Sequence, residues 1–407
     1  MERKLNILFV SATVPYPAID GGRIRVLSLI QNISKFSKIT FLTYNSSDKD
    51  EQGIKYLRDI GIDVLDIKWN YDNTLSIMLS VFKQVLKGKP LTIAKYYSSA
   101  TAKKINELLD MNSYDILHLE MLHAGQYITE ISDRHNTKII LDQQNIDSLI
   151  WQRLVKTEKN LFRKLMLDWQ YKSFLNIENK MSSMFDVCVC VSEEDAERLK
   201  SINPNIKTEV VPNGVDIDYF FPSETPENEK QIVFVGSMDW SPNEDAVLYF
   251  CDQIFLSIKS EIPDIKFYIV GSNPTDRVLK LKEIEGVIVT GLVDDVRSYI
   301  SQSAVFVVPL RIGGGTRLKI LQALAMKKAV VSTSVGCEGL GLTHKEHLFI
   351  SDNPNEFADS VILLTRDKIL RHSLAENGRN LVQNQYDWKT ISLKLDAVYR
   401  KVVGSSV

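Results

Sequence analysis

The strongest restriction on the fold comes from residues 307–325, where an apolar run meets three consecutive glycines and then an amphipathic segment. Residues 307–310 predict a buried strand, Gly313-Gly314-Gly315 a loop, and the residues from about 316 a helix with apolar side chains at helical spacing. The first amide groups of such a helix have no partner within the helix. Because glycines let a ligand approach the main chain closely, this arrangement predicts an anion site.

Positive side chains surround the same loop. Arg311, Arg317 and Lys319 lie close to the three glycines in the sequence, and the start of a helix itself favours negative charge. A phosphate or diphosphate fits this combination best. The alternative is a plain connection between strand and helix with surface cations, and the loop alone does not decide between the two because short glycine motifs have many false positives.

A second glycine loop follows the first predicted strand. Residues 5–10 are apolar, Gly21-Gly22 close the loop after them, and residues from about 23 to 36 have apolar side chains at helical spacing. The amides of Gly21 and Gly22 are therefore candidates to donate hydrogen bonds to a ligand, with Arg23 and Arg25 nearby. An ordinary turn is the alternative, because the loop is not a full dinucleotide fingerprint.

Short apolar runs alternate with helix-like segments along the chain. They lie at residues 39–43, 63–67, 116–119, 139–141, 186–191, 232–235, 267–270, 287–289, 304–308 and 329–332. This alternation predicts an α/β protein with two doubly wound, mostly parallel sheets. Ligands of such sheets lie beyond the carboxyl ends of the strands, so Gly236, Gly271, the 313–315 loop and Gly336 are expected at one sheet edge.

The bulk properties narrow the function classes. A chain of 407 residues is too long for one ordinary core, and the polar residues 225–230 mark a domain boundary. The net charge of −2 argues against nucleic acid as a main partner. No apolar run approaches the roughly 18 residues that span a bilayer. Cys188 and Cys190 alternate on an apolar run, which predicts two small core residues on one side of a strand.

Residues 74–105 contain no acidic residue. They carry six lysines among apolar and aromatic side chains: Lys83, Lys87, Lys89, Lys95, Lys103 and Lys104. This basic 83–104 stretch suits an anionic membrane face or a lipid-diphosphate acceptor, and a solvated helix face over the core is the alternative. The same two interpretations apply to residues 151–184, a long stretch of predicted helical structure with basic residues near its start.

Several motifs together make the chain resemble the family-four retaining glycosyltransferases. They are Pro15-x-Pro17 with Gly21-Gly22, Val191-Ser192-Glu193-x-Asp195, Val211-Pro212-Asn213-Gly214-Val215-Asp216, the block from Arg311 to Ala325, and Val330-Val331-Ser332-Thr333 with Gly336. In this order they cover nearly the whole length. The resemblance implies the GT-B fold, in which two Rossmann-like domains face each other across a cleft that holds a sugar nucleotide. We predict an N-terminal acceptor-side domain over 1–222, joined by a helix at about 386–407, and a C-terminal nucleotide-sugar domain over 223–385.

The resemblance also implies roles for individual residues. Arg317 and Lys319 would neutralise the leaving diphosphate and are the expected catalytic residues. The expected donor-binding residues are Gly21, Gly22, Gly236, Ser237, Gly314, Gly315, Thr316, Leu318 and Gln322. The acceptor-side candidates are His118, Glu120, Asp142, Gln144 and Asn145. No cofactor is implied, because the sugar nucleotide is a co-substrate. No metal is implied either, because the sequence shows no carboxylate pair at a strand end that would bind a divalent ion.

The chain departs from the family pattern at three places. Gly314 and Gln322 stand where the family usually has two glutamates, and Gln144 stands at or near a usual histidine. Ser237 and Asn243 replace a usual arginine and lysine. The charge of Arg317 and Lys319 could replace what is lost there.

The resemblance implies a retaining transfer of a hexose-type sugar from a nucleotide-diphosphate donor to a saccharide or lipid-linked acceptor, in bacterial surface-polysaccharide assembly. The expected location is the cytoplasm or the inner face of the cell membrane. A degenerate GT-B protein that binds a nucleotide or a partner without turnover is the alternative, which the departures favour. A sugar-nucleotide epimerase is a third candidate, although the chain lacks a clear acid–base pair. An inverting enzyme would need a side-chain base, with Asp142, Glu120 or His118 as candidates.

Overall fold

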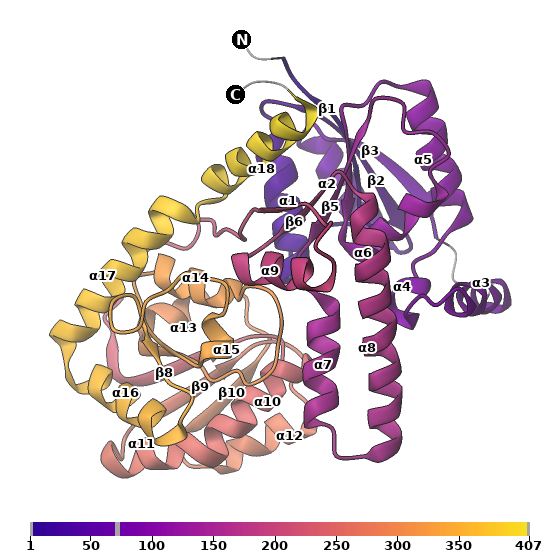
Figure 1. Cartoon of the computed structure of the whole chain (residues 1–407). Coiled ribbons are helices and arrows are strands. Elements are labelled where there is room, and N and C mark those ends of the chain that lie inside the picture. Colours follow the sequence, from indigo (N-terminus) through magenta and orange to yellow (C-terminus); the bar gives the residue numbers. More distant parts are fainter. Residues whose placement is uncertain (1–2, 70–73, 405–407) are drawn as a thin grey trace. The chain divides into compact units, whose positions relative to one another are not determined.

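The computed structural model describes residues 3–69 and 74–404. The chain divides into two compact units (Figure 1). Unit 1 comprises the residues up to Pro212 together with those from Trp388 onward, and unit 2 comprises Asn213–Asp387. Each unit is built on one parallel sheet covered by helices, which confirms the predicted fold class of two doubly wound, Rossmann-like domains. The ends of the predicted domains, residues 1–2 and 405–407, lie outside the described residues.

The sheet of unit 1 has seven strands in the order β3-β2-β1-β4-β5-β6-β7. Their bounds are β1 Asn6–Val10, β2 Lys38–Asn45, β3 Asp63–Lys68, β4 Ile116–Glu120, β5 Lys138–Gln143, β6 Val187–Cys190 and β7 Thr208–Val210. Cys188 and Cys190 are fully buried on β6 in one core cluster, as predicted. The strand order reverses at β1, between β2 and β4, which is the usual ligand position in such sheets.

Ten α-helices of the described residues belong to unit 1. They are α1 Gly21–Ile33, α2 Asp48–Asp59, α3 Thr74–Leu86, α4 Leu91–Ala94, α5 Ser99–Met111, α6 Met121–Gly125, α7 Asp147–Thr157, α8 Leu161–Met181, α9 Glu193–Ile202 and α18 Trp388–Val403. The C-terminal helix α18 packs on α1, and Ile391 and Leu395 share a core cluster with Val26 and Ile30.

The long helical stretch predicted over 151–184 is not one continuous helix. Helix α7 ends at Thr157, and α7 and α8 form a helical hairpin. The break has a local cause, because the side chain of Asn160 accepts a hydrogen bond from the amide of Arg163 and so caps the start of α8.

The sheet of unit 2 has six strands in the order β10-β9-β8-β11-β12-β13, and it reverses at β8, between β9 and β11. Their bounds are β8 Asn228–Val235, β9 Lys266–Val270, β10 Val287–Gly291, β11 Ser303–Val308, β12 Ala329–Ser332 and β13 Phe349–Ile350. The helices are α10 Ser241–Phe250, α11 Leu256–Glu261, α12 Asp276–Leu279, α13 Arg297–Gln302, α14 Leu318–Ala325, α15 Ser334–Cys337, α16 Pro354–Arg366 and α17 Lys368–Gln385. The polar residues 228–230, which the sequence analysis assigned to a domain boundary, form the exposed start of β8.

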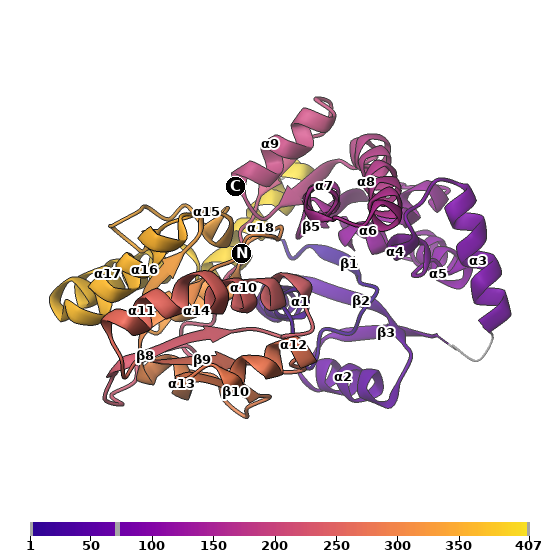
Figure 2. The ribbon, with the colours of Figure 1, turned by 90° about the horizontal axis from the view of Figure 1, so that it is seen from below.

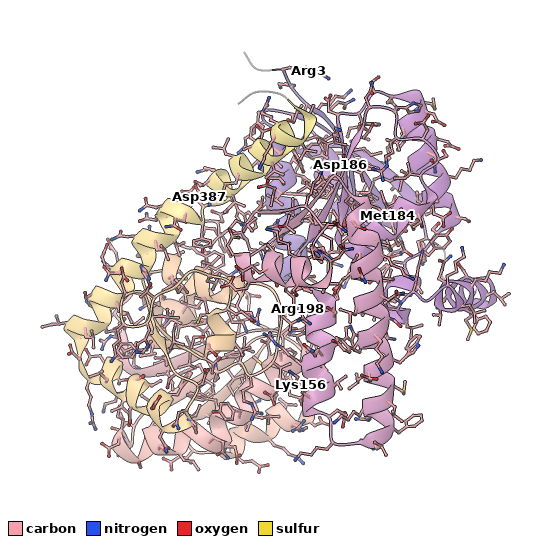
Figure 3. The ribbon with its side chains drawn as sticks, in the orientation of Figure 1. Arg3, Lys156, Met184, Asp186, Arg198 and Asp387 are labelled. Atoms are coloured by element: carbon pink, nitrogen blue, oxygen red, sulfur yellow. The ribbon has the colours of Figure 1, made fainter. Side chains whose placement is uncertain are left out.

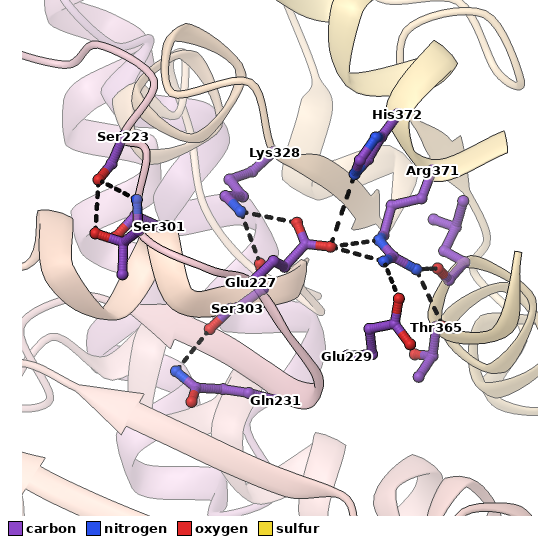
Figure 4. A network of polar contacts seen from close by, with 12 residues as sticks. Ser223, Glu227, Glu229, Gln231, Ser301, Ser303, Lys328, Thr365, Arg371 and His372 are labelled. Atoms are coloured by element: carbon purple, nitrogen blue, oxygen red, sulfur yellow. Dashed lines mark hydrogen bonds and ion pairs between the residues drawn. The ribbon is translucent and has the colours of Figure 1, made fainter. Parts of the chain in front are cut away.

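A network of charged and polar side chains joins the amino ends of the strands in unit 2 (Figure 4). Glu227, directly before β8, accepts hydrogen bonds from Lys328 at 2.9 Å and from Arg371 on α17 at 2.7 Å. Arg371 is almost completely buried and also donates to the carbonyl groups of Leu364 and Thr365. Since these ion pairs bind the amino ends together, the opposite, carboxyl edge of the sheet is left for a ligand.

Candidate functional site

Two loops meet at the point where the sheet of unit 2 reverses. One follows β8 and starts with Gly236, and the other follows β11 and contains the three glycines. Gly313 and Gly315 have φ angles of 150° and 64°, conformations that favour glycine. The helix after the loop, α14, begins at Leu318 without a hydrogen bond from a capping side chain. Its first amides are therefore suited to an anion.

Lys319 lies at the centre of this edge. Its Nζ atom donates a hydrogen bond to the Oδ1 atom of Asn243 at 2.8 Å and lies 4.0 Å from the ring centre of Phe234. A Cβ atom placed on Gly236 would come within 2.8 Å of the same Nζ atom. Burial, followed by repulsion from Arg317, lowers the pKa of Lys319 from 10.5 to about 7. Lys319 is thus a partly buried amine that has no carboxylate partner among the ion pairs of the described residues.

The two arginines of the predicted anion site have other partners. Arg317 donates from Nη1 to the carbonyl oxygen of Gly314 at 2.6 Å and from Nη2 to that of Val335 at 3.2 Å. Arg317 therefore holds the glycine loop in shape. Arg311 pairs with both carboxylate oxygens of Asp245 and lies over the ring of Tyr249. Its charge, which the sequence suggested for the anion site, is thus compensated by an acidic side chain.

The remaining donor-binding candidates of unit 2 lie on the same two loops and on α14. The hydroxyl of Ser237 donates to Asp239 at 2.5 Å, and its carbonyl oxygen accepts from Asn243 at 2.8 Å. The hydroxyl of Thr316 accepts from the Nδ2 atom of Asn213 at 2.7 Å. Gly314 and Gly315 are partly exposed, and so are Leu318 and Gln322 on α14. The structure thus gathers Gly236, the glycine loop and Lys319 at the reversal point.

In unit 1 the glycine pair belongs to a helix. Gly21 and Gly22 are the first two residues of α1, and Asp20 caps this helix by accepting a hydrogen bond from the amide of Arg23. In an α-helix the amides of the first turn, here those of Gly21 and Gly22, have no carbonyl partner within the helix. Gly22 contacts Gln144, since a Cβ atom at Gly22 would lie 3.3 Å from the Oε1 atom of that side chain.

Arg25 does not lie among the ligand-facing cations, contrary to the sequence analysis. It is fully buried, and its guanidinium binds both carboxylate oxygens of Asp142, at 3.0 and 2.9 Å. The helical spacing gives the reason, because Arg25 lies four residues before the buried Leu29 and shares its face of α1. Asp142, at the end of β5, is also fully buried.

Three acceptor-side candidates, His118, Glu120 and Gln144, meet beside this ion pair. The imidazole of His118 stacks on Phe9, binds the hydroxyl of Tyr399 at 2.8 Å through Nδ1, and has its Nε2 atom 3.6 Å from Glu120 and 3.7 Å from Asp142. Glu120 accepts a short hydrogen bond from Gln144, and burial, then the charge of Asp142, raises its pKa. Asn145 follows on a partly buried bend. Tyr399 was missed by the sequence analysis, because 281 residues separate it from His118 and no local pattern marks the contact.

His118, Glu120 and Asp142 could also hold a metal ion, since their ligand atoms lie within 4.8 Å of one another. The ion pair argues against this use. Both oxygens of Asp142 already bind the guanidinium of Arg25, and that positive charge would repel a cation in the same buried space.

The basic 83–104 stretch is not a uniform surface. Its residues lie at the end of α3, on α4, at the start of α5 and in the connections between these helices. The lysines at 83, 87, 95 and 103 are exposed. Lys89 is buried instead, where it donates to Gln126 at 3.2 Å and lies over the ring of Tyr97. Burial lowers its pKa to about 8. Among the described residues, no helix combines the length and the apolar character needed to cross a bilayer.

Comparison with known proteins identifies related sequences for both units. The family model described as Glycosyltransferase Family 4 matches residues 81–219, and that described as Glycosyl transferases group 1 matches residues 229–367. An uncharacterised 44.6 kDa protein in the cps region of Klebsiella pneumoniae is 24% identical over 396 residues, which is 95% of this chain and 97% of that protein.

Solved structures match the full length. Sucrose-phosphate synthase from Thermosynechococcus elongatus has a TM-score of 0.70 at 16% identity, covering 99% of this chain and 100% of that one. HepE from Anabaena, solved in complex with UDP, has a TM-score of 0.66 at 12% identity, covering 98% and 100%. These matches confirm that the two units together have the GT-B fold.

Proposed function

The chain belongs to glycosyltransferase family 4, and on that premise we propose that it moves a hexose-type sugar from a nucleotide-diphosphate donor to a saccharide or lipid-linked acceptor, with retention of configuration. The observation that carries the donor part is the position of Lys319. Its amine lies beside Gly236 and Asn243, at the reversal point where doubly wound sheets bind ligands.

In unit 2 the donor diphosphate is bound by main-chain amides at Gly314, Gly315 and Thr316 and at the start of α14. Lys319 neutralises the charge that develops on the leaving diphosphate, and Arg317 adds charge while it holds the loop. Gly236 and Ser237 contact the donor from the loop after β8. Gln322 hydrogen-bonds the ribose without charge, and Leu318 packs beside it.

In unit 1 the amides of Gly21 and Gly22 donate to the donor phosphate. Gln144 takes the place of the histidine that the family usually has, and the hydrogen bond from Gln144 to Glu120 fixes the orientation of its amide. Asn145 and the ends of β4 and β5 face the acceptor side. Asn145 is partly exposed, and its amide group can donate and accept hydrogen bonds, which supports a hydroxyl-rich acceptor.

Burial of the candidate bases supports retention. Direct displacement with inversion needs a side-chain base that reaches the acceptor hydroxyl. His118 and Asp142 are fully buried, Glu120 is nearly so, and Asp142 is bound by Arg25. In a front-face transfer the departing phosphate oxygen helps to remove the acceptor proton, so stabilisation of that oxygen matters most.

Two similar proteins support the substrate classes. HepE was solved with UDP and with UDP-glucose, which supports a nucleotide-sugar donor. The Klebsiella relative lies in the cps region, which supports a role in bacterial surface-polysaccharide assembly. We place the reaction in the cytoplasm, with a peripheral contact between the exposed lysines of the basic 83–104 stretch and the inner membrane face.

The test is release of nucleoside diphosphate from a panel of sugar nucleotides by the purified chain, which needs no known acceptor. Release from one donor, with retained configuration in the product once an acceptor is found, supports the proposal. The second candidate is a degenerate protein that binds nucleotide without turnover, which Gly314, Gln322 and Gln144 favour because they lack the usual acidic and imidazole groups. Thermal-shift binding without release from any donor would support that candidate instead.

A further inference from the structure

The connection between α7 and α8 forms a free end that projects from the body of unit 1 (Figure 1). The first turns of α8 carry large apolar side chains there, of which Trp169 exposes 44% of its surface and Leu161 exposes 74%. The full set is Leu161, Phe162, Leu165, Met166 and Trp169, here called the α8 stripe. An exposed set of this size is unusual on a folded domain and marks a contact surface.

The spacing of the α8 stripe places its members on one face. They stand at positions i, i+1, i+4, i+5 and i+8, so 3.6 residues per turn bring them together along the helix. The core does not explain this face, because the buried side chains of α8 begin only at Phe174.

Positive charge borders the α8 stripe. Arg163 and Lys164 are exposed and, at the helical repeat, lie on its two opposite edges. Lys159 is exposed before the helix, and Lys156 is exposed near the free end of α7 (Figure 3). The nearby acidic side chains are engaged, since Glu158 accepts from the amide of Asn160 at 2.7 Å and Asp168 pairs with Lys172 at 2.7 Å.

A second helix of unit 1 repeats this pattern. Helix α3 lies at the periphery of the unit in both views (Figures 1 and 2). Its exposed apolar residues Met78, Leu79, Phe82 and Leu86 have the spacing i, i+1, i+4 and i+8, and the exposed Lys83 and Lys87 lie beside them. Two separate helices therefore combine an exposed apolar face with cations.

We propose that the free end of the α7–α8 hairpin is a membrane-docking surface, which inserts the α8 stripe into the interfacial layer of an anionic bilayer while the flanking cations bind lipid phosphates. Trp and Phe suit the boundary between acyl chains and headgroups, and Arg and Lys suit its negative charge. A protein partner fits less well, because lysine is depleted at protein interfaces. The surface lies outside the glycine loops and Lys319, so the inference does not rest on the proposed donor chemistry.

The test is flotation of the full chain with vesicles of phosphatidylcholine, alone or mixed with phosphatidylglycerol. We expect at least tenfold tighter binding to the anionic vesicles. Phe162→Ser/Leu165→Ser and, separately, Arg163→Glu/Lys164→Glu should each weaken it by tenfold or more. The matched controls are Ile369→Ser/Leu393→Ser, which removes exposed apolar side chains elsewhere, and Lys180→Glu/Lys200→Glu, which makes the same charge change away from the free end. Both controls should bind like the parent chain.

Three results would overturn the inference. The first is a parent chain that floats equally with neutral and anionic vesicles, or with neither. The second is binding of the α8 variants that is as tight as that of the parent. In the third case the chain forms a concentration-dependent oligomer that Phe162→Ser/Leu165→Ser abolishes, without vesicle binding, and the α8 stripe is then a protein interface. Circular dichroism confirms that the variants are folded. Donor hydrolysis in solution should stay unchanged in them, which separates this inference from the proposed function.

Discussion

The Nζ atom of Lys319 donates a 2.8 Å hydrogen bond to the Oδ1 atom of Asn243, so a helix that follows β11 brings a cation to the loop that follows β8. The sequence suggested that Lys319 compensates for the basic residue that Asn243 replaces. The contact agrees with this suggestion, because it places the amine of Lys319 next to the side chain of Asn243. It also corrects one assumption, because Lys319 is not an exposed surface cation. It is partly buried on Phe234, and that burial makes its charge sensitive to pH and to ligands.

Lys319→Ala should lower turnover by at least a hundredfold while the variant stays folded. The amine is proposed to stabilise charge on the leaving group, and loss of such a donor typically costs about 3 kcal/mol in the transition state. The measurement is steady-state release of nucleoside diphosphate. Lys282→Ala, an exposed lysine of the same unit, is the control and should leave the rate unchanged. Unchanged kinetics in Lys319→Ala would remove this residue from the site.

Binding of a nucleoside diphosphate should take up close to one proton at about pH 8. The pKa of Lys319 is about 7 without ligand, so most amines are neutral at that pH, and a bound diphosphate favours the charged form. At about pH 6 the amine is already charged, and the uptake should vanish. Isothermal titration calorimetry with UDP in two buffers of different ionisation enthalpy measures the effect. Lys319→Met should show no uptake at either pH, and uptake that persists there would contradict this assignment.

Gly236→Ala should weaken donor binding by about tenfold or more with little loss of stability. The added methyl group would lie 2.7 Å from Nδ2 of Asn243 and 2.8 Å from Nζ of Lys319. Both are ends of side chains, which can move, so strain would displace the two groups rather than unfold the sheet. Thermal-shift titration with UDP and UDP-sugars checks this prediction. Ser237→Ala adds no atom, serves as control, and should bind more tightly than Gly236→Ala.

The alternation of apolar runs and helix-like segments was sufficient to predict both sheets, because buried parallel strands read as short continuous apolar runs. Two short strands, β7 and β13, were not predicted in this way. β7 is only partly buried, and β13 has two residues, so neither produces a distinct apolar run. The break between α7 and α8 was missed as well, since Asn160 acts there as a capping residue within a stretch of otherwise helical composition.

The candidate site was less predictable than the fold. The glycines after β11 could be placed from local sequence, because the geometry of strand, loop and helix fixes their amides. The surroundings of individual charges could not, since they depend on contacts between distant residues. In the sequence both Lys89 and Arg25 look like surface cations. In the structure they are buried, where Lys89 binds Gln126 and Arg25 binds Asp142. Only the helical position of Arg25, in register with buried residues of α1, hinted at this.

Arg25→Met should destabilise the chain by about 3–5 kcal/mol, because it leaves the carboxylate of Asp142 buried without its partner. The double variant Arg25→Met/Asp142→Leu should recover most of that loss, since an apolar pair of similar size needs no compensation. Urea unfolding followed by far-UV circular dichroism measures both. A single variant that loses less than about 1 kcal/mol would show that water or another group solvates Asp142.

Glu178→Gln should make the chain more stable than the parent at about pH 9 and flatten its stability between about pH 5 and pH 9. Glu178 is buried on α8 and accepts a hydrogen bond from the amide of Ser148 at 3.0 Å. Burial raises its pKa from 4.5 to about 8, so the folded chain binds more protons than the unfolded chain between those values. The resulting stability is complete below about pH 4.5 and is lost as the pH rises through about 8. Glutamine remains neutral and avoids that loss. Melting temperatures across this range test the sign, with the exposed Glu197→Gln as control, and a parent chain whose stability rises over the same interval relative to Glu178→Gln would refute it.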